Sequence, residues 1–211
     1  EETASSAVDE NEAAAAQLLN DLTGSYQELW PVILADEYKQ TWLDDCTALV
    51  GEDNAEAAFE KLSSMVTGDV YGEDAVKAYA NGGGAYFCGF TNSLAILTFD
   101  GETSTISGTD KDGNVLFSHT YHYIGMEPVR GLYEFQSDDA DSGEFTYFFL
   151  APDTSAETYH IEFSYGSDAE ALSQYDTGEY AYWLASGIST DCDQTMINNC
   201  IELFCTENLA G

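Results

Sequence analysis

Short segments in which apolar and polar residues alternate fill the middle of the chain, and they constrain its fold more than any other feature. They span residues 86–90, 94–99, 104–109, 115–123, 132–135, 145–150 and 158–163. A period of two is the pattern of a strand with one buried face. Asp112-Gly113 between two such runs is typical of a β-hairpin. Six or seven strands at this spacing predict an antiparallel barrel or sandwich.

Helical periodicity flanks these strands on both sides. Apolar residues recur every three or four positions within residues 17–49 and 54–66, and a shorter helix is expected near 73–79. After the strands, Ser167-Asp168 can cap a short helix, and Ser189 or Thr190 can cap a longer one. The chain is therefore expected to be mainly β with flanking helices.

We expect one domain over residues 17–211, with a disordered acidic tether before it. Residues 1–16 are acidic and rich in Ala and Ser, and Val8 is their one apolar side chain larger than alanine. The domain divides into a helical front over about 17–80, a barrel over about 84–165 and C-terminal helices over about 167–207. An exported protein whose leader has been removed would begin with such a tether, so we expect an extracellular or cell-surface location.

Negative charge excludes several partners. The chain has 39 acidic and 5 basic residues, a formal net charge of −34. Phosphate backbones and anionic lipid surfaces repel such a chain, so nucleic acid is not an expected partner. No apolar run reaches the roughly 18 residues of a membrane-spanning helix, so membrane insertion by this domain is not expected either. Because 44% of the residues are hydrophobic, the chain should nevertheless fold.

Motifs for catalysis are missing from the sequence. It contains no G-x-S-x-G, no phosphate-binding loop and no dinucleotide fingerprint, so we do not expect an enzyme. The five cysteines form no C-x-x-C pair, which argues against a zinc knuckle. The sequence leaves their state open between free thiols, one or two disulfides and an intermolecular bridge. They are Cys46, Cys88, Cys192, Cys200 and Cys205.

Three histidines on predicted strands are the remaining candidates for chemistry. His160 and Glu162 are two positions apart, so they share one face of a strand and can chelate one ion. Nitrogen and carboxylate ligands suit zinc. The competing interpretation is an exposed polar strand face, which is the commoner origin of a His-x-Glu pair. His119 and His122 are three apart, so they point to opposite faces.

Four segments resemble one known family along nearly the whole chain. The first is residues 24–34, GSYQELWPVIL, and the second is residues 118–123, SHTYHY. The third combines Leu150-Ala151-Pro152 with residues 160–166, HIEFSYG, and the fourth is the aromatic run within residues 178–189. Their order and spacing resemble the ZinT (YodA) family of exported bacterial zinc-binding proteins. The resemblance implies a lipocalin-like (calycin) antiparallel β-barrel flanked by helices.

The resemblance also implies a metal site. The family binds zinc through three histidines, two of them in a His-x-His pair. Here His160 and Glu162 stand at that pair, and Phe148 stands at the third position. His119, on a strand face with Tyr121 and Tyr123, is the candidate for a replacement ligand. The implied function is a zinc-binding accessory protein, with a divalent metal ion and a metal transporter as partners. The alternative is a lipocalin-like small-molecule-binding or interaction module that has lost the metal site.

Overall fold

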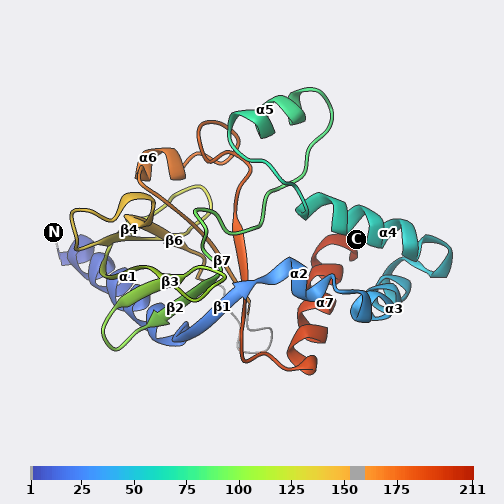
Figure 1. The fold of residues 1–211 in the computed structure, drawn as a ribbon, viewed down its shortest axis with the longest axis horizontal. Coiled ribbons are helices and arrows are strands. Elements are labelled where there is room, and N and C mark those ends of the chain that lie inside the picture. Colours follow the sequence, from blue (N-terminus) through green and yellow to red (C-terminus); the bar gives the residue numbers. More distant parts are fainter. Residues whose placement is uncertain (1, 153–159) are drawn as a thin grey trace.

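The protein forms a closed, eight-stranded antiparallel β-barrel with helices outside it (Figure 1). This computed structural model describes the backbone of residues 2–152 and 160–211, and side chains from residue 10 onward within those ranges. The strands are β1 (Gly24–Glu28), β2 (Ile96–Asp100), β3 (Thr105–Thr109), β4 (Val115–Met126), β5 (Tyr133–Ser137), β6 (Tyr147–Leu150), β7 (His160–Gly166) and β8 (Ala185–Ser189). Each strand pairs with the next, and β8 pairs with β1. The predicted barrel is confirmed.

Two barrel strands lie in segments that the sequence assigned to helices. β1 interrupts the predicted helical front, and β8 lies in the predicted C-terminal helical region. Conversely, the predicted strand at 86–90 is wrong, because Phe87 makes only isolated bridges to Thr67 and Trp183. The hairpin at Asp112-Gly113 is confirmed as the β3–β4 connection. Residues 158 and 159 of the last predicted strand lie outside the described residues.

Most helices gather on one side of the barrel (Figure 1). They are α1 (Glu2–Asp21), α2 (Leu29–Ile33), η1 (Asp36–Tyr38), α3 (Lys39–Val50), α4 (Glu52–Val66), α5 (Glu73–Ala80), η2 (Gly143–Phe145), α6 (Ala169–Leu172) and α7 (Gln194–Leu209). We call α2, α3, α4 and α7 the helical layer, since they share one apolar core. No described helix has the length and apolar character needed to cross a membrane.

The expectation of a disordered tether over residues 1–16 is corrected by α1. This helix extends from residue 2, and Ala15 is fully buried. Leu18, Leu19 and Leu22 continue the same apolar face into the core of the barrel. Alanine is the best helix former, so a stretch rich in alanine forms a helix once its last turns have a surface to pack on.

Side-chain oxygens cap the two C-terminal helices. Asp168 accepts hydrogen bonds from the backbone N–H groups of Glu170 and Ala171, as predicted for α6. The cap of α7 is Asp193, whose carboxylate accepts from the N–H of Met196 at 2.9 Å. The predicted cap at Ser189 or Thr190 is therefore wrong, because the chain is still leaving β8 there.

Candidate functional site

The interior of the barrel is filled by aromatic rings. Phe148, Phe163 and Tyr165 are fully buried, and the rings of Phe148 and Tyr165 stack with centroids 5.2 Å apart. Aromatic side chains supply much apolar contact area per residue. They occupy the space that a ligand enclosed within the barrel would need, which counts against that form of the small-molecule alternative.

His160 and Glu162 lie on the opposite, outward face of β7. Side chains alternate along a strand, so the two flank the inward-facing Ile161 and are joined on the same side by Ile188 and Ser186, their partners on β8. This face meets the helical layer. The ring of His160 contacts that of Phe204 on α7 edge to face, with centroids 5.7 Å apart, and His160 is only 8% exposed. The predicted shared face is confirmed.

His119 does not join this pair, which corrects its assignment as the third ligand. It shares a face of β4 with Phe117 and Tyr121, which belong to the barrel core. Its Nδ1 lies 2.6 Å from a carboxylate oxygen of Asp139. A side chain on the inward face of one strand cannot converge with side chains on the outward face of another. His122 points away from His119 and pairs with Asp138 instead.

Strand β6 contributes no ligand beside Glu162. Phe148, which the resemblance placed at the third histidine position, points into the barrel. The residue opposite Glu162 is Ala151, which directly follows β6 and whose backbone N–H donates to the carbonyl oxygen of Glu162 at 2.9 Å. Across residues 10–152 and 160–211, no group of three or more His, Cys, Asp or Glu side chains is placed to hold a metal ion. The described residues thus supply two candidate ligands.

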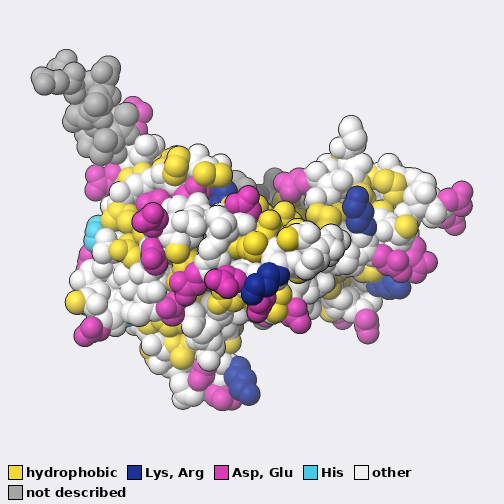
Figure 2. All heavy atoms as spheres, turned by 90° about the horizontal axis from the view of Figure 1, so that it is seen from above, with side chains coloured by type: hydrophobic (Ala, Val, Ile, Leu, Met, Phe, Trp, Pro, Cys, Tyr) yellow, Lys and Arg dark blue, Asp and Glu magenta, His cyan; other side chains and the backbone are white. Residues whose placement is uncertain are grey.

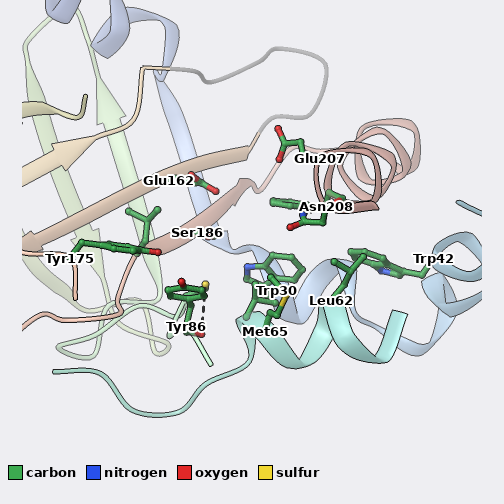
Figure 3. A pocket seen from close by; sticks show the side chains of 14 residues that line it. Trp30, Trp42, Leu62, Met65, Tyr86, Glu162, Tyr175, Ser186, Glu207 and Asn208 are labelled. Atoms are coloured by element: carbon green, nitrogen blue, oxygen red, sulfur yellow. Dashed lines mark hydrogen bonds between the residues drawn. The ribbon is translucent and has the colours of Figure 1, made fainter. Parts of the chain in front are cut away.

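A cavity of about 190 Å³ adjoins Glu162, between the barrel and the helical layer (Figure 3). Its walls are mostly aromatic and apolar, and its two ionisable carboxylates are Glu162 and Glu207. Among the described residues, no Lys, Arg or His lines it, although Arg130 lines an adjoining pocket that also includes Glu162, Tyr175 and Leu184. The lining residues are Trp30, Trp42, Leu62, Met65, Val66, Tyr86, Cys88, Glu162, Tyr175, Leu184, Ser186, Phe204, Glu207 and Asn208.

Two polar groups in the cavity wall have unusual surroundings. The indole N–H of Trp30 is buried and meets no described acceptor in regular hydrogen-bond geometry, although it lies close enough to the Cys88 sulfur to lower the pKa of that thiol. Its neighbour Cys88 offers only sulfur, a weak acceptor. Burial, and secondarily the charge of Glu162, raises the pKa of Cys88 to about 12 against smaller lowering effects of Ser186 and Trp30. Cys88 therefore remains a neutral thiol at physiological pH.

The sequence predicts the strand β7 and gives no indication of the cavity beside it. Its walls come from α2, α3, α4, α7, β7, β8 and the segments around residues 86 and 175. No local pattern joins elements so far apart in the chain. The segment containing Trp30 was the one signal in the sequence for this region. It has an aromatic residue directly before Pro31, as the motif of the similar family does.

Acidic side chains are spread over the face of the molecule shown in Figure 2. On the face shown, Asp and Glu side chains are scattered over the whole outline, and Lys and Arg are few. A net charge of −34 attracts cations over long range, although physiological salt screens exposed charges beyond about 8 Å.

Comparison with known proteins gives one informative likeness. No protein-family model and no curated protein sequence matches the chain. Among solved structures, the chain is similar to the Zn(II)-bound ZinT-like domain of AdcA from Streptococcus pneumoniae, with a TM-score of 0.52 and 15% identity. The alignment covers 85% of this chain and 87% of that domain. The chain has a ZinT-like fold.

The fold expected from the sequence resemblance is thus confirmed at the level of architecture. The Zn(II)-bound full AdcA of the same organism is also similar, with a TM-score of 0.47 and 16% identity. That alignment covers 90% of this chain and 34% of AdcA, so the chain spans about a third of the length of AdcA. At this identity the likeness concerns the ZinT-like fold, and the ligands of this chain must be argued from its own residues.

Proposed function

We propose that this chain is an extracellular zinc-binding accessory protein, and a binding protein rather than an enzyme. The observation that carries the proposal is the position of His160 and Glu162. They project side by side from the outward face of β7, beside a cavity, in a ZinT-like fold. The solved domain with this fold is described as Zn(II)-bound.

The ligand atoms of this pair suit zinc. A site with two protein ligands also suits an ion that is exchanged. Imidazole nitrogen and carboxylate oxygen are both common zinc ligands, and zinc usually takes four ligands. With two ligands from β7, the other positions are open to water or to groups from a partner. An ion held in this way is released more readily than one held by a closed site, as a protein that passes metal to a transporter requires.

The burial of His160 supports its role as a metal ligand held in one orientation. Its ring is held against Phe204, and side chains fixed by packing present their ligand atoms in one orientation. Carboxylates on the surface are not held in one orientation by packing. Of the 39 acidic residues, many will attract zinc weakly, so only binding that depends on His160 counts as the proposed function.

Zinc titration of three variants tests the proposal. His160→Ala and Glu162→Gln should each weaken the tightest site by about tenfold or more, equivalent to about 1.4 kcal/mol. His122→Ala is the matched control, because it removes an exposed histidine that also contacts a carboxylate. It should leave the tightest site unchanged. Equal affinities of the wild-type protein and His160→Ala would refute the proposal.

A further inference from the structure

Two cysteines of the helical layer lie next to each other although they are far apart in the chain. Cys46 on α3 and Cys205 on α7 are both fully buried, and their sulfur atoms lie 3.9 Å apart. Either thiol can donate a hydrogen bond to the other, so both side chains point into the same contact. A disulfide bond is about 2.05 Å long, so the two sulfur atoms need to approach by about 2 Å to form one.

The helices that carry these thiols are held together by apolar packing. Both contribute to the core of the helical layer, where they lie side by side (Figure 1). The charges beside the thiols repel each other. Burial, and then the charges of Glu202 on α7 and of Asp44, raises the pKa of Asp45, the residue before Cys46. Within residues 10–152 and 160–211, no ion pair joins α3 to α7 to offset this repulsion.

We propose that Cys46 and Cys205 are a disulfide-forming pair, which closes when the chain meets a small-molecule disulfide as oxidant. The thiolate of one cysteine attacks the oxidant, which gives a mixed disulfide and releases one small thiol. The thiolate of the other cysteine then attacks the cysteine sulfur of the mixed disulfide, which forms the Cys46–Cys205 bond and releases the second small thiol. Two cysteine thiols are oxidised, the oxidant is reduced to two thiols, and these carry away both protons.

Burial decides when this bond can form. Thiolates, and not thiols, attack disulfides, and burial raises the pKa of both Cys46 and Cys205. An oxidant in solution also cannot reach sulfur atoms that are fully buried. The bond therefore forms while the chain folds or when the helical layer opens, and it exchanges slowly in the native protein. At the proposed extracellular location the surroundings are oxidising, which preserves such a bond.

The bond also restrains the helix against which His160 packs. Cys205 directly follows Phe204, whose ring contacts that of His160 with centroids 5.7 Å apart. Trp30 of the cavity wall contacts the same ring, with centroids 4.8 Å apart. A bond between α3 and α7 thus fixes α7 beside the candidate zinc ligand. Its formation does not require zinc, so this modification site goes beyond the proposed function.

Refolding in a glutathione redox buffer that contains a metal chelator tests the proposal. The reduced chain is unfolded in urea and refolded, its remaining thiols are alkylated in denaturant, and its peptides are analysed by mass spectrometry. We expect one crosslinked pair of peptides, containing Cys46 and Cys205, and alkylation of Cys88, Cys192 and Cys200. Alkylation of all five cysteines, or a bond from Cys46 to a different cysteine, would overturn the proposal. Because zinc is removed, neither result depends on zinc binding by the protein.

The folded, reduced protein tests the effect of burial. Incubation with oxidised glutathione should form the bond about tenfold or more slowly than refolding does, because the helical layer must first open. Urea below the unfolding transition should accelerate the reaction. A rate in the folded protein that equals the rate during refolding would overturn the inference that the bond forms only when these helices separate.

Thermal midpoints of two variants locate the bond. The oxidised wild-type protein should unfold about 5 °C or more above the reduced protein, because the bond closes a loop across 159 positions and so constrains the unfolded chain. Cys46→Ala should abolish this difference between oxidised and reduced samples. Cys200→Ala is the matched control, since it removes another fully buried thiol of the same core, and it should keep the difference. Each variant is compared with itself, so a general loss of stability does not affect the result. A difference in Cys46→Ala equal to that of the wild type would overturn the proposal.

Discussion

Replacing Arg130 by Met should destabilise the protein strongly, because it leaves a buried carboxylate without its counter-charge. Glu127, next to the β4–β5 turn, is fully buried, and its Oε2 lies 3.3 Å from Nε of Arg130. The guanidinium also donates through Nη2 to the carbonyl oxygen of Leu172 at 2.7 Å. It lies 5.5 Å from the ring centroid of Tyr175, a residue of the cavity wall.

The expected cost is about 3 kcal/mol of unfolding free energy. Removing one partner of a buried pair costs about 3–5 kcal/mol, because the other charge stays buried. The lower end applies here, since the Glu127 carboxylate keeps hydrogen bonds from the backbone N–H groups of Val129 and Arg130 at 2.7 and 2.9 Å. The loss of the Leu172 contact acts in the same direction.

Urea denaturation of a double-mutant cycle measures this cost. Glu127→Gln combined with Arg130→Met should be more stable than Arg130→Met alone, because the unpaired charge is gone. Lys77→Met is the control, since Lys77 makes only exposed ion pairs with Glu73 and Asp74 and should cost no more than about 1 kcal/mol. A cost below about 1 kcal/mol for Arg130→Met, or strict additivity in the cycle, would show that the Glu127 carboxylate does not depend on Arg130.

Three further predictions concern the helices and the thiols. Ala15→Glu should lower the thermal midpoint of unfolding by several degrees, because it forces a charge into the contact between α1 and the barrel. An unchanged midpoint would indicate that α1 does not pack on the barrel. Asp193→Ala should cost about 1 kcal/mol in urea denaturation through loss of the α7 cap, and no change would contradict the cap. Burial raises the pKa of Cys200 from 9.0 to about 12 and also raises that of Cys205. Their contribution to stability is therefore present below pH 9 and is lost as the pH rises toward 12, so thermal midpoints should fall over that range; constant midpoints would contradict it.

The barrel could be predicted from the sequence wherever one strand face is buried and the other is not. The residues of β8, Ala185–Ser189, are all buried, because the barrel core covers one face and the helical layer covers the other. A strand buried on both faces loses the alternation that identifies it. Its Gly187 fits a close approach, since an added Cβ would lie 3.1 Å from Cγ1 of Ile161.

The candidate site could be predicted only in part. A spacing of two was enough to place His160 and Glu162 on one face, because alternation is a local property of a strand. Choosing His119 required comparing the faces of two strands that are not neighbours in the barrel. The aromatic residues beside His119 indicate correctly that it faces the barrel interior, whereas His160 and Glu162 face outward. The cavity required the packing of the helical layer against the barrel, which no local pattern encodes.

The state of the cysteines also depends on packing between distant elements. All five are free thiols in the structure. Cys46 on α3 and Cys205 on α7 are both buried, with sulfur atoms 3.9 Å apart. They are separated by 159 positions in the chain, so the sequence alone could not show that they lie next to each other.

A zinc-edge anomalous difference map from crystals grown with zinc is the sharpest test of zinc binding by His160 and Glu162. We predict a peak between His160 and Glu162, at about 2.0–2.2 Å from an imidazole nitrogen and a carboxylate oxygen. Crystals of His160→Ala should lose this peak and keep any weak peaks at surface carboxylates. A map with peaks only at surface carboxylates, or with the same peaks in both proteins, would contradict zinc binding by this site.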